Sequence, residues 1–291
     1  MLFNTYEPWK FAFSQENSSL NNADKDSWGI IGVPFDSTTS YHTGARSGPI
    51  VVREASFGFE RYNSIFNRDL NTIFYDFGDL NVVPGNCKKT CDIVEDTVSE
   101  LITNNIKPIM IGGEHSITIG AVKAILEEYE NLTIVHLDAH RDLAIDFIGE
   151  KYSHATVLRR IHEFGISRLI QIGIRSSSKE EENFVDLQNN ITTFKAKDFK
   201  HHLDEIAKEL LNINNPIYLT IDMDVLDPSF APNVGNPTPS GLSIQDIEFI
   251  LETLSKKEIV GLDVVETATN ELGDITAVVA SKIIYDFLSL F

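Results

Sequence analysis

The chain has 291 residues, of which 42% are hydrophobic and 23% are charged, proportions that are ordinary for a globular protein and exclude intrinsic disorder. Its formal net charge of −19 offers no basic surface, so we expect neither nucleic acid nor a membrane as a partner. The acidity either keeps the surface soluble or also attracts a cationic substrate.

The cysteine content, together with the lack of a signal-like or membrane-spanning segment in the sequence, indicates the cellular compartment. The only two cysteines, Cys87 and Cys91, make neither a disulfide framework nor a zinc knuckle, which fits a reducing environment and predicts inert thiols. The first residues lack a basic segment followed by an apolar one, and no stretch of about 18 residues is apolar and uncharged. We therefore expect a cytoplasmic protein.

Short apolar runs follow a polar leader, residues 1–26, which we expect to form an N-terminal arm of one domain spanning 1–291. The runs are rich in β-branched residues and bounded by turn residues, as in strands buried on both faces. They are 27–33, 72–76, 107–112, 132–137, 168–174, 191–194, 216–222 and 258–264.

Helical patterns lie between these runs. Segment 114–129 places apolar residues on one face, and 243–254 does the same after a capping-box pair, Ser243 and Asp246. Strands alternating with helices predict a three-layer α/β/α fold with a central parallel sheet of about eight strands.

Carboxylates and imidazoles follow three of the predicted strands at the point where each strand ends. In chain order they are His115, Asp138, His140, Asp142, Asp222 and Asp224. The carboxyl ends of parallel strands meet at one edge of a sheet, so we expect these side chains to lie together. Within the D-x-H-x-D run, alternate side chains share one side of an extended chain. Four crowded carboxylates are costly unless cations neutralise them.

This set of ligands predicts two divalent metal ions per chain, whose charge balances the four carboxylates. An oxygen-rich set with two imidazoles favours Mn²⁺ and tolerates Co²⁺ or Zn²⁺. Two ions about 3.5–4 Å apart can hold a bridging water and lower its pKa towards neutrality, which yields a hydroxide nucleophile. Three unrelated polar loops are the alternative, and the convergence of three complementary motifs disfavours it.

Here the motifs resemble those of a known family. GGEHS (112–116), DAHRD (138–142) and TIDMDVLDPSFAP (220–232) are similar to the three signatures of the ureohydrolases, which include arginases, agmatinases and guanidino-acid hydrolases. DFGDLNVVPG (76–85) and GLDVVE (261–266) extend the resemblance, which runs almost end to end and looks most like the agmatinases. It implies the arginase fold, two Mn²⁺ ions, a homo-oligomer (trimer or hexamer), and hydrolysis that releases urea and an amine.

The resemblance also implies roles for single residues. Asp138 and Asp222 would bridge the metals, His115 and Asp142 would complete one metal, and His140 and Asp224 the other. Asp142 would in addition pass a proton to the leaving amine. Glu266 matches the glutamate that pairs with the guanidinium, and His154 matches a histidine that shuttles protons or positions substrate. The alternative for His154 is a capping role at the start of a helix.

The resemblance favours agmatine, a cationic guanidine, hydrolysed to putrescine and urea by attack of a metal-bridging hydroxide on the guanidinium carbon. Arginases have an asparagine where this chain has Ala144, and acidic residues where it has Ser176–Ser178. An amino-acid substrate would leave its α-groups desolvated and unpaired, which disfavours arginine. Residues 231–237 and 266–271 depart from the agmatinase pattern, so a guanidino-acid hydrolase, a formimidoyl hydrolase and a non-catalytic member remain alternatives.

Other polar residues carry weaker expectations. Asn233 and Asn236 are candidates for binding the distal amine of the substrate. Arg141 alternates away from the ligands and should form a structural ion pair. His136 should be a buried strand histidine, and His42 is placed either at the pocket or on the surface. His162, His201 and His202 are expected on the surface.

Overall fold

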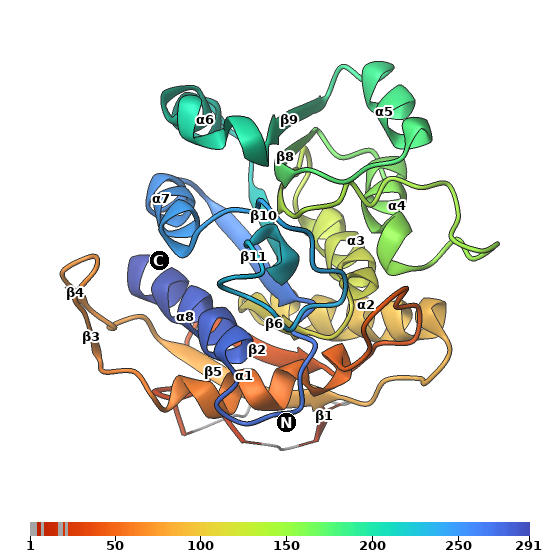
Figure 1. Cartoon of the computed structure of the whole chain (residues 1–291). Helices are drawn as coiled ribbons and strands as arrows, with labels where there is room; N and C mark the ends of the chain where they lie inside the picture. The colour runs from red at the N-terminus through yellow and green to blue at the C-terminus, as the bar shows by residue number, and fades with distance from the viewer. Residues whose placement is uncertain (1–4, 7–8, 17–19, 21–22) are drawn as a thin grey trace.

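The computed structural model describes residues 5–6, 9–16, 20 and 23–291. The strands of its main sheet are β1 (Thr5–Tyr6), β2 (Trp28–Val33), β5 (Phe74–Leu80), β6 (Lys107–Gly112), β7 (Thr133–Leu137), β8 (Arg168–Ile174), β9 (Ile191–Lys195), β10 (Ile217–Asp222) and β11 (Ile259–Val265). Their order is β1-β5-β2-β6-β11-β10-β7-β8-β9 (Figure 1). All neighbours pair in parallel except β1 with β5. A second small sheet pairs β3 (Tyr62–Asn63) with β4 (Arg68–Asp69).

Helices cover both faces of the main sheet (Figure 1). They are α1 (Gly48–Ser56), α2 (Cys87–Thr103), α3 (Thr118–Glu128), α4 (Val157–Glu163), α5 (Lys179–Asp186), α6 (Leu203–Leu211), α7 (Ile244–Leu254) and α8 (Ile275–Leu290). Short 3₁₀ turns are η2 (Ala45–Ser47), η3 (His115–Ile117), η4 (His154–Thr156), η5 (Ala196–His201) and η6 (Met223–Val225). One apolar cluster includes residues of α1, α6, α7 and α8, and another includes residues of α2, α3 and α4. The predicted three-layer fold with eight parallel strands is confirmed.

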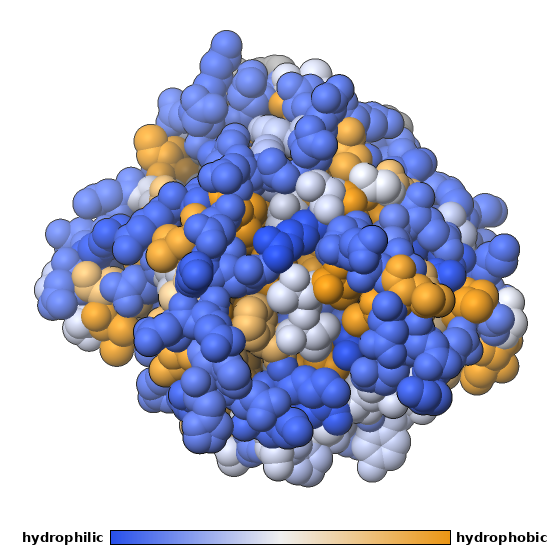
Figure 2. All heavy atoms as spheres, turned by 90° about the horizontal axis from the view of Figure 1, so that it is seen from above, coloured by the Kyte–Doolittle hydropathy of each residue, from blue (hydrophilic) through white to orange (hydrophobic). Residues whose placement is uncertain are grey.

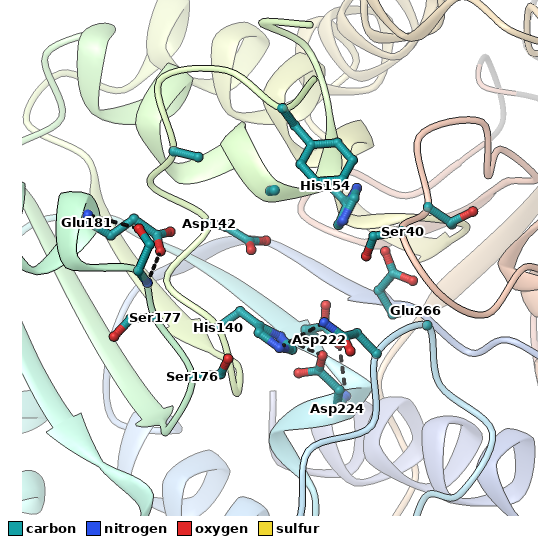
Figure 3. Close-up of a pocket in the computed structure, with 17 residues that line it drawn as sticks. Ser40, His140, Asp142, His154, Ser176, Ser177, Glu181, Asp222, Asp224 and Glu266 are labelled. Carbon is teal, nitrogen blue, oxygen red and sulfur yellow. Dashed lines mark hydrogen bonds and ion pairs between the residues drawn. The ribbon is translucent and has the colours of Figure 1, made fainter. Parts of the chain in front are cut away.

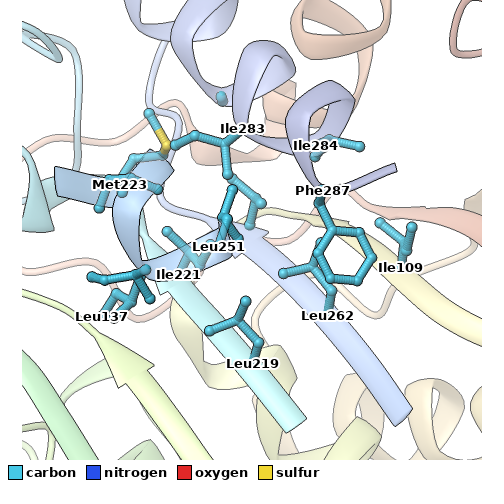
Figure 4. Close-up of a cluster of buried hydrophobic side chains, with 14 of the residues drawn as sticks. Ile109, Leu137, Leu219, Ile221, Met223, Leu251, Leu262, Ile283, Ile284 and Phe287 are labelled. Carbon is cyan, nitrogen blue, oxygen red and sulfur yellow. The ribbon is translucent and has the colours of Figure 1, made fainter. Parts of the chain in front are cut away.

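Figure 4 shows part of the first cluster, between α8 and the centre of the sheet. Ile283, Ile284 and Phe287 of α8 pack with Leu219 of β10 and Leu262 of β11, and all five are at most 1% exposed. Each such side chain contributes roughly 1.5–3 kcal/mol by leaving water. These apolar runs therefore fix the central strands, whose ends carry the polar residues.

Two elements differ from the sequence expectation by more than one residue. Strand 72–76 is shifted, because β5 begins at Phe74 and continues to Leu80 through Asp76 and Asp79. These buried carboxylates interrupt the apolar run, but both form ion pairs with the fully buried Arg53 of α1, at 2.7 Å for Asp76. Burial alone would lower the pKa of Arg53, but the two carboxylates raise it above its usual value, so the guanidinium stays charged.

The helix predicted at 114–129 begins with the 3₁₀ turn η3, because Glu114 is extended, and continues as α3 from Thr118. The helix predicted at 243–254 is confirmed as α7. The Ser243 hydroxyl accepts a hydrogen bond from the Asp246 N–H, and the Asp246 carboxylate accepts one from the Ser243 N–H, which is the predicted capping box.

The described part of the leader packs against the sheet. β1 extends it beyond β5, and the buried Phe11 donates its N–H to Asp76 at 2.6 Å. The rest of the predicted arm lies outside the described residues. Within the described chain, no helix combines the length and the apolar character needed to cross a membrane. The face in Figure 2 is mostly hydrophilic, with hydrophobic residues in small separate groups.

The strand order decides where the polar residues meet. β6, β11, β10 and β7 are consecutive neighbours in the sheet, and all four are parallel. Their carboxyl ends therefore lie side by side at one edge, the position where open α/β sheets place their ligand sites.

Candidate active site

The six residues predicted as metal ligands gather at the ends of β6, β7 and β10, and four of them are labelled in Figure 3. His115 is brought there by the Gly112-Gly113 pair after β6. A Cβ atom on Gly113 would lie 1.8 Å from the carbonyl oxygen of Phe35, which no real side chain tolerates. Glycine at this position thus lets the loop after β2 pass directly over the end of β6.

His115 presents one ring nitrogen to three carboxylates. Its Nδ1 lies 3.2 Å from Asp138 Oδ2, 3.1 Å from Asp142 Oδ2 and 3.4 Å from Asp222 Oδ2. The imidazole is fully buried, and Nδ1 has no hydrogen-bond partner. The ring and the three carboxylates therefore surround one common point.

The other nitrogen of His115 fixes the tautomer of the ring. Nε2 lies 2.9 Å from the hydroxyl oxygen of Thr220, and that hydroxyl donates to Asp263 Oδ1 at 2.6 Å. Since the Thr220 hydroxyl already donates its only proton, its oxygen accepts Nε2–H, so Nδ1 carries the lone pair whenever the ring is neutral. A lone pair that faces three carboxylates is stable only with a cation between them, so this arrangement fits a metal ion.

His140 forms the second half of the cluster. Its Nδ1 lies 2.9 Å from Asp224 Oδ2 and 3.5 Å from Asp138 Oδ1. Asp138 is thus shared between the His115 half and the His140 half, each of which brings possible ligand atoms within 4.8 Å of one another. Asp222 Oδ1 accepts the backbone N–H of Asp224 at 2.8 Å, so the Asp222 carboxylate caps the η6 turn that carries Asp224.

His136 also lies beside Asp138, but its proton positions argue against a role as a ligand. The side-chain amide of Gln171 donates to His136 Nδ1 at 3.1 Å and to the Arg141 carbonyl at 2.9 Å. Nε2 therefore carries the proton and donates to Asp138 Oδ2 at 2.8 Å. His136 is the buried strand histidine that was expected, and it orients the shared carboxylate.

The electrostatics of the cluster call for positive charge. Burial, together with repulsion from Asp224 and Asp138, raises the pKa of Asp222 well above its usual range. Burial and Asp138 raise the pKa of Asp142 to about 7. Burial would lower the pKa of His140, but Asp224 and Asp138 raise it to about 12. Burial raises the pKa of Asp224 as well, whereas at Asp138 the neighbouring histidines outweigh burial and lower the pKa well below its usual range. Four buried carboxylates with two imidazoles form a donor set that suits divalent cations.

Two of the predicted catalytic carboxylates sit on strained backbone. Asp142 has a φ of 54° and Glu266 a φ of 65°, in the left-handed region that non-glycine residues rarely adopt. Such conformations cost on the order of 1–3 kcal/mol and persist where the surroundings fix them. The Asp142 carbonyl accepts hydrogen bonds from the N–H groups of Leu158 and Arg159 at the start of α4, which hold it in place.

Glu266 follows β11 and offers a free carboxylate oxygen to the pocket (Figure 3). Its Oε1 accepts the backbone N–H of His115 at 2.8 Å, whereas its buried Oε2 has no partner. Gly235 lies so close that a Cβ atom there would be 2.4 Å from Oε2. Burial and the nearby Glu114 raise the pKa of Glu266, so its carboxyl favours a cationic partner.

His154 lies in η4, and its ring points into the same pocket (Figure 3). The Phe147 ring packs against it edge-on, with ring centroids 5.1 Å apart. Its Nδ1 lies 3.2 Å from the Thr38 hydroxyl. Burial, with the positive charge of His115 and His140, lowers the pKa of His154 to about 4. The N-cap of η4 is Ser153, so His154 is not the capping residue.

One cavity of about 250 Å³ is lined by His140, Asp142, His154, Asp222, Asp224 and Glu266, whereas the fully buried His115 and Asp138 are not part of its lining. Ala144 and Ser176–Ser178 lie on its wall, at the positions that distinguish this chain from the arginase pattern. Neither lysine nor arginine occurs among the described residues that line it. The described lining is therefore acidic and holds no lysine or arginine that could pair with a substrate carboxylate.

Sequence reasoning missed the acidic residue of this wall, Glu181. Glu181 of α5 is 8% exposed and faces the cavity across from Glu266 (Figure 3). Its oxygens accept the N–H groups of Leu143 at 3.0 Å and Ser178 at 2.8 Å. In the sequence it is one member of a run of three glutamates after a serine, a pattern that indicates only a helix start.

Of the two asparagines considered for binding the distal amine, only Asn236 lines the cavity. Asn236 lines the cavity, and its side-chain amide lies 3.1 Å from His140 Nε2. Asn233 instead donates to Asp274 at the start of α8 and does not line the cavity, so its predicted contact with a distal amine is wrong. The segment 231–237 thus contributes a partner of His140 through a residue outside the family pattern.

The remaining expectations are settled by contacts. Arg141 is 2% exposed and forms an ion pair with Glu182 at 2.8 Å, the structural role that was predicted. His42 is exposed, stacks on Tyr41 and does not line the cavity. Cys87 and Cys91 are free, buried thiols. Of the three histidines expected on the surface, His201 is exposed, whereas His162 and His202 are half-buried.

Comparison with known proteins agrees with this geometry. A model of the arginase family matches residues 26–289. The chain is 39% identical over 285 residues to the N(1)-aminopropylagmatine ureohydrolase of Thermococcus kodakarensis, with 97% of this chain and 94% of that protein covered. It is 34% identical over 289 residues to the agmatinase of Pyrococcus horikoshii, with 98% and 97% covered. The crystal structure of the agmatine ureohydrolase of Thermoplasma volcanium matches with a TM-score of 0.88 and 34% identity, covering 98% of this chain and 94% of that one.

Proposed function

This chain belongs to the arginase family of metal-dependent hydrolases, and we propose that it is a two-manganese amidinohydrolase that converts agmatine to putrescine and urea. One observation carries the choice of substrate class. The cavity has a carboxylate at each side, Glu266 and Glu181, and no basic residue among its described lining. A guanidinium at one end and an amine at the other match this pattern of charge.

Six residues would hold the metal ions. His115 and Asp142 would hold one ion and His140 and Asp224 the other, with Asp138 and Asp222 between the two. When bound, the ions supply a water molecule of lowered pKa. The unpartnered, buried Nδ1 of His115 supports this assignment.

The protein side chains would position the guanidinium and move protons. The free Oε2 of Glu266 would accept guanidinium N–H groups, while the His115 N–H fixes its Oε1. Asp142 would take a proton and return it to the leaving amine. His154 stays neutral at physiological pH and would accept a hydrogen bond or a proton from the amine side.

Glu181 would bind the distal amine. Each of its oxygens already accepts one backbone N–H, which orients the carboxylate and leaves further lone pairs for the substrate. A guanidino acid would instead place a carboxylate beside Glu181, a repulsive contact in a poorly hydrated cavity. Arginine would leave its α-carboxylate without a basic partner.

The experiment is urea release by the Mn²⁺-loaded protein from agmatine, N1-aminopropylagmatine, guanidinobutyrate and arginine. We expect kcat/KM for agmatine at least about tenfold above guanidinobutyrate and arginine, roughly 1.4 kcal/mol of transition-state binding. N1-aminopropylagmatine is included because a 39% identical relative is named for it. A preference for guanidinobutyrate would replace this proposal with a guanidino-acid hydrolase, and no urea from any substrate would favour a non-catalytic member.

The role of Glu181 has its own matched test. Glu181→Gln should lower kcat/KM for agmatine by about tenfold or more, but leave butylguanidine, which lacks the distal amine, nearly unchanged. Glu180→Gln is the control, because Glu180 is the exposed neighbour in the same helix turn. Equal losses for both substrates would show that Glu181 only supports the local structure.

A further inference from the structure

Two residues outside the proposed catalytic set contact His154 through a short hydrogen-bond chain. Thr38, in the loop after β2, places its hydroxyl oxygen 3.1 Å from the His154 backbone nitrogen and 3.2 Å from His154 Nδ1. The same hydroxyl lies 2.6 Å from Glu114 Oε1, and the Thr38 N–H lies 2.6 Å from Glu114 Oε2. Glu114 is fully buried and precedes His115.

Counting protons along this chain gives one arrangement. A threonine hydroxyl has one proton to donate and two lone pairs to accept with. The Glu114 carboxylate accepts that hydrogen bond, and Ser116 donates a second hydroxyl to the same Oε1 at 2.6 Å. Burial raises the pKa of Glu114, but these two hydroxyls and the Thr38 N–H are three donors that favour its ionised form. Both lone pairs of the Thr38 oxygen therefore face donors, which are the His154 backbone N–H and the His154 ring at Nδ1.

From this geometry we infer that Thr38 and Glu114 are positioning residues, which hold His154 in the tautomer with its proton on Nδ1 and its lone pair on Nε2. The ring is anchored at Nδ1 by Thr38 and on its face by Phe147, so Nε2 is the nitrogen directed into the cavity. Because burial keeps the imidazole neutral, the tautomer decides what the ring offers to a ligand.

The consequence for catalysis rests on the proposed function. A guanidinium carries only N–H donors, so a lone pair on Nε2 can accept a hydrogen bond from it. An Nε2–H group would instead place two donors against each other. The same lone pair can take up a proton on the amine side of the substrate. Because Thr38 and Glu114 already hold His154 in this tautomer, its ring proton does not have to move when the substrate binds.

Glu114→Gln should reverse the direction of the hydrogen bonds between residue 114, Thr38 and His154, because glutamine has nearly the same shape as glutamate but carries an amide that donates. The Gln amide nitrogen at the former Oε1 would donate to Thr38 and Ser116, while its oxygen still accepts the Thr38 N–H. The Thr38 proton would then turn to His154 Nδ1 and move the ring proton to Nε2. Nitrogen-15 NMR of histidine-labelled protein loaded with diamagnetic Zn²⁺ reads the tautomer directly, and the His154→Gln variant assigns the signal.

Kinetics provide the second readout. Thr38→Val removes the hydroxyl at nearly constant shape, and we expect kcat for agmatine to fall at least about tenfold with Mn²⁺ content unchanged. Thr38→Ser keeps the hydroxyl and should restore kcat to within about threefold of the wild type. Ser37→Ala is the control for loop perturbation, because it removes the exposed hydroxyl that accepts the Gly85 N–H at 3.0 Å, outside the cavity lining, and we expect it to keep the wild-type kcat.

The outcomes separate this inference from the proposed function. A wild-type spectrum with the His154 proton on Nε2, or an unchanged tautomer in Glu114→Gln, would overturn the inference even if agmatine is hydrolysed. Full activity of Thr38→Val would do the same. If the wild type hydrolyses no guanidine but its NMR spectrum shows Nδ1–H, reversed in Glu114→Gln, the proposed function fails and the tautomer control stands.

Discussion

At the scale of single residues, the site depends on which atoms carry protons. The lone pair of His115 faces the carboxylates because Thr220 and Asp263 take up its other nitrogen. His136 lies equally close to Asp138, but Gln171 turns it into a donor. Similar residues next to one carboxylate thus receive opposite roles from the hydrogen bonds behind them.

Asp142 is the residue whose replacement should affect chemistry most selectively. Asp142→Asn keeps the size of the side chain but removes a negative charge and the group that carries the proton. We expect kcat to fall at least about a hundredfold, measured by urea release together with the metal content of the purified variant. A variant that keeps kcat within tenfold of the wild type would exclude Asp142 as the proton carrier.

Metal binding should release protons and weaken in acid. Without metal, the carboxylates raise the pKa of His115 and His140, the latter to about 12, so both imidazoles are protonated at neutral pH. Metal ions need the neutral rings, hence binding expels protons and affinity rises with pH. Calorimetric titration with Mn²⁺ in two buffers of different ionisation enthalpy measures this release. We expect two equivalents per chain; affinity independent of pH would contradict the assigned ligands.

At the scale of elements, a close helix contact supports the end of β6. A Cβ on Gly120 of α3 would lie 2.2 Å from the Cys91 carbonyl oxygen of α2, so the two helices meet backbone to backbone. α3 continues directly from η3, which carries His115. The spacing of these helices thus helps to place a proposed metal ligand.

Gly120→Ala should push the two helices apart. The neighbouring atoms are backbone and cannot move cheaply, so we expect a loss of roughly 1–3 kcal/mol in unfolding free energy, measured by denaturant titration. Glu127→Ala, on the exposed side of α3, is the matched control and should change stability by about 0.5 kcal/mol or less. Equal stabilities of the two variants would mean that the contact relaxes freely.

At the scale of the whole molecule, the net charge of −19 should matter for substrate capture. Agmatine is a dication at neutral pH and is attracted over a distance set by the ionic strength, whereas the carboxylate of guanidinobutyrate is repelled. In about 0.5 M salt the Debye length falls to roughly 4 Å, and this attraction is largely screened.

A competition between agmatine and guanidinobutyrate at low salt and at 0.5 M salt tests this expectation. The preference for agmatine should shrink at high salt but persist, because the contacts with Glu181 and Glu266 inside the cavity are screened less than those on the surface. A preference that does not change with salt would assign the whole selectivity to the cavity, and preference for the acid at both salts would contradict the proposed substrate.

The sequence by itself determined the layers of the fold and the chemistry of the cluster. Apolar runs such as 107–112 and 216–222 predict strands because burial on both faces demands them. The D-x-H-x-D run marks three ligands after one strand, but the expected extended alternation is wrong, because β7 ends at Leu137 and Asp142 has a φ of 54°. The motifs also identified the family, which the match to the arginase family model confirms. Each of these signals involves residues that are close together in the chain, so each can be recognised without knowledge of the tertiary structure.

Only the tertiary structure decided which distant residues complete the site. Glu181 faces the cavity, where the backbone N–H groups of Leu143 and Ser178 hold its carboxylate, and Thr38 reaches His154 although 116 positions separate them. β5 passes through Asp76 and Asp79 because Arg53 comes from α1 to neutralise them. Such partners depend on the strand order and on hydrogen bonds between segments that are remote in the sequence. Burying a charge costs free energy unless a partner compensates it, and that partner is present only after the remote segments have packed together.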